Sequence, residues 1–432
     1  MAVDKRRTVV AQNSCSCAMP GVWRAVAHNP GCVVVYHAPR ACTHVTGTMD
    51  LYQHYHDIVG EERAREGYTA PLVSTNITDK QTIFGGGKLL GRCLDYVVAT
   101  YHPEYIMVAN SCISGVIGDD TEGICREKER EHGLPIINTE AHGFLDGEYY
   151  GGYCDAAKRL VDRFMTKEEE RCNQICVLGE KGGPYSRNAQ DISRLFAGFQ
   201  VDAQQRFPSY CSLADFQLIA KSRWLVPLGG SAKAYEWMSG LAQYMGERLG
   251  MEVFDADYPV GIAATYAWLE RLGHFLGQPE RIEYAQAQAC DELETAMDSY
   301  RAALDGIHAV IVLGRRLANS NPHWVLEMTA QVGMHIDGIV FVGAGSRDSW
   351  SEWLSRWKIS DTLPIFTEEN AEEILSETDL VLTTVELEGA PYKQLFLPMV
   401  PPIGMSGLTY IYRRLFQLSC YRRRRGVILN GW

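Results

Sequence analysis

The chain has 432 residues, of which 46% are hydrophobic, and its formal net charge is −12. A chain of this length can bury the cores of two or three domains, and a mildly acidic chain is a poor candidate for general nucleic-acid binding. No apolar stretch approaches the ~20 residues needed to cross a bilayer, and the start, MAVDKRRTVV, lacks the apolar core of a secretory signal. We therefore expect a cytoplasmic protein that contacts neither nucleic acid nor membrane.

The first third of the chain alternates short apolar runs with amphipathic segments, which is the pattern of an α/β domain. The run GCVVVYHA predicts a buried strand, and a proline separates a helix from a second strand in CLDYVVATYHPEYIMVAN. We predict strands at 31–38 and 134–141, a helix followed by a strand within 93–110, and a helix at 149–165.

The same alternation restarts after the charged stretch TKEEER at 166–171. Here we predict a strand at 175–183, a helix at 188–200, a helix and a strand within 216–230, and a helix at 234–251. Gly250 is expected to cap the last of these helices. A third set then predicts helices at 281–305 and 321–334 and strands at 308–314, 337–344 and 379–386.

Three successive sets of strands and helices predict an α/β protein with three doubly wound, Rossmann-like domains and mainly parallel sheets. We place the domains at residues 1–166, 167–265 and 266–432, the last with a C-terminal helical segment. Ligand sites in such folds lie at the carboxyl ends of the strands.

The thirteen cysteines are the unusual feature of the composition. A reducing compartment keeps thiols reduced, so a disulfide framework is not expected. We expect a few thiolates to bind metal or an iron–sulfur cluster, while most cysteines are small buried core residues.

Three cysteines lie where strands or helices of the first domain are expected to begin or end. Cys112 follows the apolar run at 105–110, Cys42 follows the strand at 31–38, and Cys17 precedes Pro20. Separate elements can aim three such thiolates at one place, and the absence of a tight C-x2-C pair favours a cluster over a single zinc ion. On spacing alone, three core cysteines remain the alternative.

The segments around these cysteines help to decide between cluster ligands and core cysteines. Pro-Gly follows Cys17, the pattern H-x-P-x-x-C ends at Cys42, and the two cysteines are 25 residues apart. The stretches STNITDKQTIFGGGKLL at 74–90 and NSCISGVIGDD at 110–120 complete the set. Together these segments resemble the nitrogenase component 1 family, strongly over residues 15–145 and mainly in domain plan over the rest.

The resemblance implies that Cys17, Cys42 and Cys112 bind half of an iron–sulfur cluster at a subunit interface, with a partner supplying the other half. The cluster would be of the P-cluster type, 8Fe–7S or 4Fe–4S, and Cys15 is the rival of Cys17 for one ligand position. An ATP-dependent iron-protein reductase would dock transiently and hydrolyse the nucleotide. This chain would bind none, because IFGGGKLL is typical of a glycine-rich turn that enters a helix near Lys88.

The family's active-site metallocofactor is held by one cysteine and one histidine, and these positions fall near Ala234 and Ile403. No cysteine lies between Cys211 and Cys290, and no histidine follows His335. The resemblance therefore implies a beta-type subunit in a heterotetramer with a homologous alpha-type chain that carries the catalytic cofactor. A long N-terminal extension is absent, so a nitrogenase-like reductase is preferred to nitrogenase itself, and methylthio-alkanes, reduced with release of methanethiol, are the favoured substrates.

Several alternatives stay open at this point. One alternative is a nitrogenase-cofactor assembly scaffold. Others are a subunit of nitrogenase or of a dark tetrapyrrole reductase, and a nucleotide-binding α/β protein with inert cysteines. Cys172 and Cys176 are expected to be core or edge thiols, and the basic run 422–425 a solvated tail or docking surface. The first-domain histidines are expected to be surface or hydrogen-bonded groups, with two of them near Cys42; they are His28, His37, His44, His54 and His56.

Overall fold

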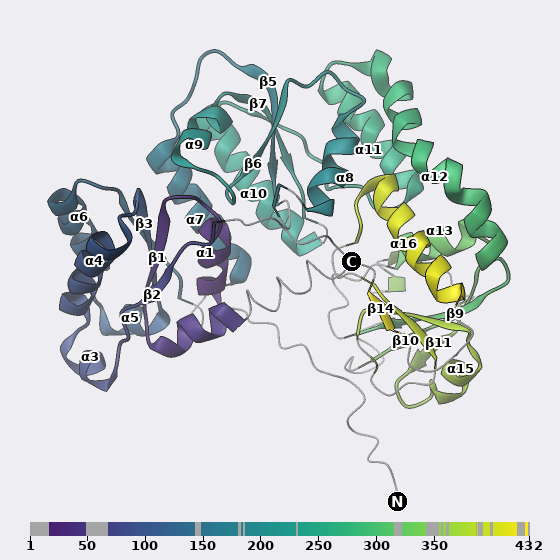
Figure 1. Cartoon of the computed structure of the whole chain (residues 1–432), viewed down its shortest axis with the longest axis horizontal. Helices are drawn as coiled ribbons and strands as arrows, with labels where there is room; N and C mark the ends of the chain where they lie inside the picture. Colours follow the sequence, from purple (N-terminus) through teal and green to yellow (C-terminus); the bar gives the residue numbers. More distant parts are fainter. Residues whose placement is uncertain are drawn as a thin grey trace, which may run out of the picture.

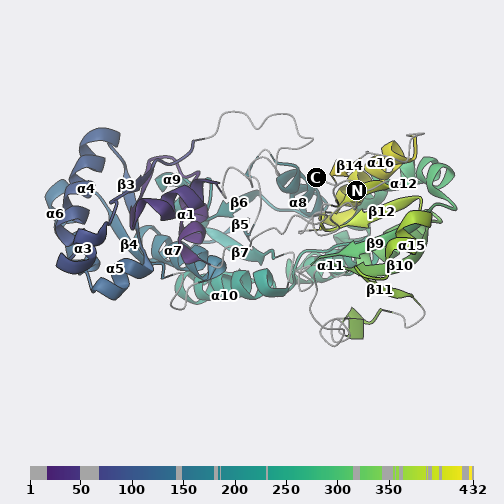
Figure 2. The same ribbon diagram turned by 90° about the horizontal axis from the view of Figure 1, so that it is seen from below.

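The structure is a computed structural model. It describes residues 17–48, 68–142, 148–179, 183–184, 186–229, 232–314, 322–342, 354–355, 357–359, 363–385, 387, 392–397, 401–420 and 428–430. Within these residues the chain forms three parallel β-sheets, and Figures 1 and 2 both place the second sheet between the first and the third. The predicted α/β class and its mainly parallel sheets are confirmed.

The first sheet carries the loops that hold the three cysteines. Its strand order is β2-β1-β3-β4, with all neighbours parallel. The strands are β1 (Cys32–His37), β2 (Leu72–Ser74), β3 (Tyr105–Asn110) and β4 (Ile136–Glu140). Helices α1 (Ala18–Val26) and α7 (Tyr149–Phe164) cover one face, and α4 (Gly87–Tyr101) and α6 (Thr121–His132) cover the other. Since both faces are covered, β1 and β3 are buried along their whole length, and each is apolar up to its last residue.

Side chains of β1 alternate between the two faces, as the period of a strand requires. Val33 and Val35 pack beneath α4, whereas Val34 and Tyr36 pack beneath α1 and α7. Two short helices, α3 (Asp79–Phe84) and α5 (Cys112–Ile117), lie at the carboxyl edge of this sheet and contact each other.

The second sheet has the order β6-β5-β7-β8. Its strands are β5 (Cys172–Leu178), β6 (Ala203–Phe207), β7 (Ser222–Pro227) and β8 (Glu252–Val253). The helices of this part are α8 (Arg187–Phe196), α9 (Leu213–Ala220), α10 (Ala232–Leu249) and α11 (Ile262–Phe275). Gly250, with φ 79°, follows α10 in the left-handed conformation that a side chain disfavours, as expected for a helix cap.

The third sheet is the widest and has the order β11-β10-β9-β12-β13-β14. Its strands are β9 (His308–Leu313), β10 (His335–Phe341), β11 (Ile365–Thr367), β12 (Leu380–Thr383), β13 (Lys393–Phe396) and β14 (Ile428–Asn430). The helical elements of this part are the 3-10 turn η1 (Pro279–Arg281), α12 (Ile282–Leu304), α13 (His323–Gln331), α15 (Glu372–Glu377) and α16 (Gly404–Cys420). In Figure 1, α16 lies beside α12, and the two helices contact each other.

The first and second sheets share one hydrophobic core. A single cluster of buried side chains runs from Tyr36 under α1 and α7 to Leu225 and Met245 of the second sheet and α10. Helices α1 and α7 cross closely because glycines stand at the crossing: a Cβ on Gly152 would lie 2.1 Å from the Ala18 carbonyl oxygen. The α1–α7 pair therefore fixes the position of Cys17, which directly precedes α1.

Hydrogen bonds also join the second part of the chain to the last helix. The Ser406 hydroxyl donates to Asp191 of α8 at 2.7 Å, and the Tyr258 hydroxyl donates to the Pro401 carbonyl at 3.1 Å. Each sheet falls inside one of the three predicted domains, whose boundaries remain a prediction. Among the described helices, none combines the length and apolarity required for a membrane span.

Candidate metal centre

Cys42 and Cys112 lie beyond the carboxyl ends of two neighbouring strands. Strands β1 and β3 pair in parallel register up to His37 opposite Asn110, so both chains leave the sheet at the same edge. Residues 40–48 are helical, with Cys42 in the first turn, and Cys112 is the first residue of α5. Ser111 ties the two loops together, since its amide and its hydroxyl both donate to the His37 carbonyl, at 3.2 and 2.9 Å.

Cys17 reaches this same edge from α1. It is the N-cap residue of α1, and the Tyr36 hydroxyl near the end of β1 donates to the Met19 carbonyl at 2.6 Å. Burial raises the pKa of Tyr36 well above its usual value, and the neighbouring Cys17 and Cys42 thiols raise it further. Both cysteines therefore lie around one buried phenol, while Cys112 starts the helix at the end of the next strand.

These three cysteines are less buried than the core cysteines. Cys17, Cys42 and Cys112 are half-buried, as are Cys93 of α4 and Cys172 at the start of β5, which lie in other places of the fold. Burial raises the pKa of Cys125 and of Cys154 to about 12 in each case, which keeps these two thiols protonated and unsuited to bind metal. The other fully buried cysteines are Cys32, Cys176, Cys211 and Cys290. Cys15, the rival of Cys17, lies outside the described residues.

The spacing of the three sulfur atoms fits an iron–sulfur cluster better than a single metal ion. Among the described residues, the sulfur atoms of Cys17, Cys42 and Cys112 do not all approach within 4.8 Å of one another, as the ligands of one zinc ion would. A cluster presents a separate iron to each thiolate, so its ligands need not meet at a point. Half-buried thiols at a sheet edge also leave room for a second chain.

A buried hydrogen-bonded pair, His37 and Asp119, connects the loops of this edge. His37 Nε2 lies 3.0 Å from Asp119 Oδ2, His37 Nδ1 lies 3.1 Å from the Thr75 hydroxyl, and the Gly86 amide donates to Asp119 at 2.8 Å. A Cβ on Gly86 would lie 2.7 Å from Asp119, so the position requires glycine. The network joins the end of β1 to the glycine turn before α4 and to the turn that follows α5.

The two consecutive aspartates after α5 have different roles. Asp120 accepts from the Gly123 amide at 2.9 Å and caps α6, whereas Asp119 pairs with His37. The signal for the pair was present in the glycines of IFGGGKLL and in the tandem aspartates. As expected, the glycine-rich stretch is a turn, and α4 starts at Gly87.

The histidines do not form a metal cage in the described part of the chain. His37 is buried and hydrogen-bonded, His44 is exposed, and His54 and His56 lie outside the described residues. The described residues contain one three-residue group with metal-ligand spacing: Asp95, Glu131 and His132. The Lys128 ammonium lies 2.9 Å from Asp95 and 2.7 Å from Glu131, so a lysine already neutralises these carboxylates.

An apolar patch borders the cysteine edge. Ile83 and Phe84 of α3 are 73% and 79% exposed, and Val116 of α5 is 75% exposed. Because α3 and α5 contact each other and α5 begins at Cys112, the patch is close to the proposed ligands. Exposed apolar side chains gathered on adjoining elements are typical of an interaction surface.

The two positions matched to the cofactor ligands are apolar and buried. Ala234 lies in α10, and Ile403 packs in the core between the second sheet and α11. Neither side chain offers a donor atom to a metal.

The comparison with protein families agrees with these observations. A family model described as nitrogenase component 1 type oxidoreductase matches residues 17–405. The chain belongs to this family. The prediction made from the segments around Cys17, Cys42 and Cys112 is thereby confirmed at the level of the family.

Two relatives and one solved structure illustrate where the chain falls among nitrogenase component 1 proteins. It is 28% identical over 62% of its length to the nitrogenase iron-molybdenum cofactor biosynthesis protein NifE of Clostridium pasteurianum. It is 25% identical over 74% of its length to the nitrogenase molybdenum-iron protein alpha chain of Methanosarcina barkeri. The aligned part of the chain spans 58% of each of these two proteins.

The structure of nitrogenase Cp1 at pH 6.5 matches with a TM-score of 0.66 and 17% identity. The match covers 97% of this chain and 95% of that one. At this identity the likeness concerns the fold, and it confirms that the three sheets are arranged as in nitrogenase component 1.

Proposed function

We propose that this chain is the beta-type subunit of a nitrogenase-like, ATP-dependent reductase. In this proposal Cys17, Cys42 and Cys112 hold one half of an iron–sulfur cluster, and a homologous alpha-type chain holds the other half within a heterotetramer. The observation that carries the proposal is the placement of three half-buried thiols, from three separate elements, at one edge of the first sheet. When bound, the cluster would supply low-potential one-electron transfer.

The protein's own elements favour thiolates at this edge. Cys17 caps α1, Cys42 lies in the first turn of the helix at 40–48, and Cys112 begins α5. The first turn of a helix exposes unpaired backbone N–H groups and the positive end of the helix dipole. Both features favour the anionic sulfur that iron requires.

The apolar patch of Ile83, Phe84 and Val116 supports a docking partner beside the cysteines. We assign to it the transient contact with an ATP-dependent iron-protein reductase. Close docking shortens the path of the electron and excludes water from the edge. In this proposal ATP is hydrolysed on that partner. The glycine-rich turn before α4 holds the Asp119 carboxylate, which accepts from the Gly86 amide.

Buried apolar residues at the two matched cofactor positions, Ala234 and Ile403, support the beta-type assignment. The catalytic metallocofactor is accordingly assigned to the alpha-type partner. The favoured substrates are methylthio-alkanes: two electrons and two protons cleave the bond between the alkyl carbon and sulfur, giving an alkane and methanethiol. This substrate class rests on the family resemblance.

A second candidate function is a scaffold for nitrogenase-cofactor assembly. The observation that favours it is the similarity to NifE, a protein named for cofactor biosynthesis. Such a scaffold would hold a cofactor precursor beside the same cluster and would release it without turnover. Nitrogenase and dark tetrapyrrole reductase are further alternatives.

The cluster assignment is tested by anaerobic co-purification of the full chain with its alpha-type partner, followed by iron and sulfide analysis and EPR. We expect C17S, C42S and C112S each to lose iron and to change the EPR signal. C420S is the matched control, because Cys420 is exposed at the end of α16 and should leave both unchanged. An unaltered EPR signal in C112S would refute the ligand assignment.

The reductase and scaffold functions are separated by turnover. The iron-loaded complex is mixed with an iron-protein reductase, ATP and a methylthio-alkane, and methanethiol is measured. Methanethiol that depends on ATP supports the reductase. A complex that retains its cluster, yields no product and transfers a metallocofactor precursor to apo-nitrogenase supports the scaffold.

A further inference from the structure

One tyrosine hydroxyl connects the two helices that carry Cys17 and Cys42. Tyr36 lies near the carboxyl end of β1, and its side chain is fully buried. Its hydroxyl donates to the Met19 carbonyl at 2.6 Å and lies 3.3 Å from the Thr46 hydroxyl. A phenol has one hydrogen to donate, so the hydrogen between Tyr36 and Thr46 comes from the threonine.

Both contacts of the phenol fall close to a cysteine. Met19 is two residues after Cys17, in the first turn of α1. Thr46 is four residues after Cys42 and therefore lies on the same face of the helix at 40–48. Thr46 is 1% exposed, whereas the adjacent Val45 is 46% exposed. The helix at 40–48 thus rests on the core at Thr46, on the face that carries Cys42.

The hydroxyl of Tyr36 does more than fill the core. The neighbouring positions of β1, Val33 to Val35, are aliphatic and pack without a polar atom. Burial raises the pKa of Tyr36 well above its usual value, so the phenol keeps its hydrogen and remains a donor near neutral pH. Helix α1 is also held on its other side, because a Cβ on Gly21 would overlap the Tyr149 carbonyl oxygen.

We propose that Tyr36 is a positioning residue for the iron–sulfur cluster: its hydroxyl joins the first turn of α1 to the helix at 40–48 and so fixes the separation of Cys17 and Cys42. This inference rests on the proposed function, in which these two cysteines bind iron. The irons of a cluster occupy fixed places, so its thiolate ligands must be held at a matching separation by the groups behind them.

Two substitutions remove the hydroxyls and keep the shape of the side chains. Y36F keeps the ring and removes the donor to Met19, and T46V keeps the volume of Thr46. Both leave the cysteines in place. T409V is the control for T46V, because Thr409 of α16 is also 1% exposed and donates to the Met405 carbonyl of its own helix.

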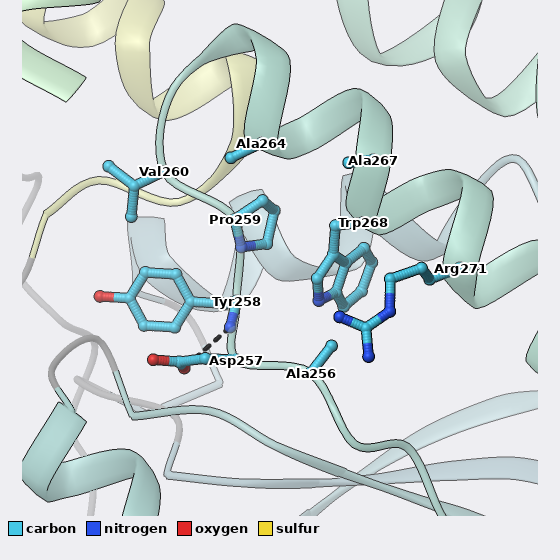
Figure 3. Close-up of a pocket in the computed structure, with 9 residues that line it drawn as sticks. All are labelled: Ala256, Asp257, Tyr258, Pro259, Val260, Ala264, Ala267, Trp268 and Arg271. Carbon is cyan, nitrogen blue, oxygen red and sulfur yellow. Dashed lines mark hydrogen bonds between the residues drawn. The ribbon is translucent and has the colours of Figure 1, made fainter. Parts of the chain in front are cut away.

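Y258F is the matched control for Y36F. Tyr258 is likewise buried, and its hydroxyl donates to a backbone carbonyl, that of Pro401, at 3.1 Å. Figure 3 shows Tyr258 on the loop that leads into α11, where it lines the cavity between the segment 256–260 and this helix. Y258F therefore loses the same kind of hydrogen bond in another part of the fold.

The first measurement needs no iron. Hydrogen–deuterium exchange is followed by mass spectrometry in the purified full chain without metal. In Y36F we expect the first turn of α1 and residues 40–48 both to exchange about tenfold faster, because a buried carbonyl and a buried hydroxyl lose their partner. T46V should accelerate residues 40–48 and leave α1 unchanged, whereas Y258F and T409V should alter neither segment. Unchanged exchange of both segments in Y36F overturns the proposal.

The second measurement uses the iron-loaded complex with the alpha-type partner. We expect Y36F to retain its iron, since its thiols are intact, but to show an altered EPR signal and to release iron to a chelator about tenfold faster. Y258F and T409V should stay within about twofold of the wild-type release rate.

The two controls separate a positioning role from a merely structural one. If Y36F and Y258F lose similar free energy of unfolding and both keep the wild-type EPR signal and iron release, Tyr36 is a core residue only and the proposal is overturned. A wild-type complex without iron refutes the cluster function instead, while the exchange rates decide whether the Tyr36 hydroxyl joins the two helices. T46V supplies the same comparison if Y36F does not fold.

Discussion

His37 and Asp119 are 82 residues apart in the chain, yet His37 Nε2 and Asp119 Oδ2 lie 3.0 Å apart, with side chains 0% and 6% exposed. The pair closes the space between the end of β1 and the turn after α5, and Asp119 also accepts from the Gly86 amide. It thus links the segments that lead to Cys42 and away from Cys112. Loss of the pair would loosen both loops together.

The first prediction concerns the pH dependence of stability. Burial lowers the pKa of His37, and Asp119 opposes this shift without cancelling it. The unfolded chain therefore takes up a proton at the usual pKa of about 6.5, while the folded chain resists it. The contribution of His37 to stability is present above about pH 6.5 and is lost as the pH falls below that value.

We expect the free energy of unfolding to decrease less steeply between about pH 7 and 5.5 in H37Q than in the wild type. Denaturant unfolding at several pH values measures the slope. H44Q is the control, because His44 is exposed and should leave the wild-type slope unchanged. Parallel slopes for H37Q and wild type would contradict the assigned pKa direction.

Much of this edge could be predicted from the sequence. Cys42 and Cys112 each follow an apolar run long enough for a buried strand, and parallel strands end at the same edge, so their placement follows from local patterns. The His37–Asp119 pair could not be placed in the same way. It depends on the register of β1 against β3 and on the path of the chain through Gly86, neither of which is encoded locally.

Four strands that the sequence did not predict are short or polar. Strands β2, β8 and β11 are only two or three residues long, and β6, with the sequence AQQRF, is polar and lies at a sheet edge. Such strands form because the register of a neighbouring strand is already fixed. Helix α11 had a readable pattern of apolar residues, but its cavity requires the segment 256–260, which helical periodicity does not describe.

The second prediction concerns the crossing of α1 and α7. A Cβ at Gly152 would lie 2.1 Å from the Ala18 carbonyl oxygen, so G152A must push α1 away from α7. We expect the free energy of unfolding to fall by about 1–3 kcal/mol, the range for overpacking a tight core.

G240A is the matched control for this crossing, because Gly240 lies in the interior of α10, and a Cβ added there would have no described atom within 4 Å. That change should stabilise the protein by about 0.5–1 kcal/mol through helix propensity. Equal effects of the two substitutions in denaturant unfolding would show that the helices do not cross as closely as described.

The third prediction concerns the junction between the first two sheets. Asn29 is buried; its amide donates to the Tyr105 hydroxyl at 3.2 Å and to the Pro208 carbonyl at 3.0 Å, and its oxygen accepts from the Cys211 amide at 3.1 Å. N29A leaves these groups without their partner in a buried place. We expect a loss of about 2–4 kcal/mol in the free energy of unfolding.

Q278A is the control for N29A. The Gln278 side chain also makes two hydrogen bonds, both to the backbone of Gln200, but in an exposed position. Water can replace these bonds, so the expected loss is below about 1 kcal/mol. A loss for N29A no larger than that for Q278A would mean that the Asn29 junction is open to water.

The fourth prediction compares the reactivity of the cysteines. Burial raises the pKa of Cys125 and of Cys154 to about 12, so at pH 8 only about one thiol in ten thousand is ionised. Iodoacetamide, followed by peptide mass spectrometry, should therefore modify these two residues at least about a hundredfold more slowly than the exposed Cys420. In denaturant all three should react at similar rates.

The same measurement distinguishes cluster ligands from core thiols. Cys112 is half-buried at the sheet edge, so we expect slow alkylation in the iron-loaded complex, where a metal-bound sulfur is blocked, and faster alkylation after anaerobic chelation of the iron. Cys420 should react quickly and Cys125 slowly in both forms, because neither depends on iron. A Cys112 rate that is the same before and after chelation would remove this residue from the ligand set, whereas a chelator-dependent increase at Cys17 and Cys42 as well would assign all three sulfurs to one cluster.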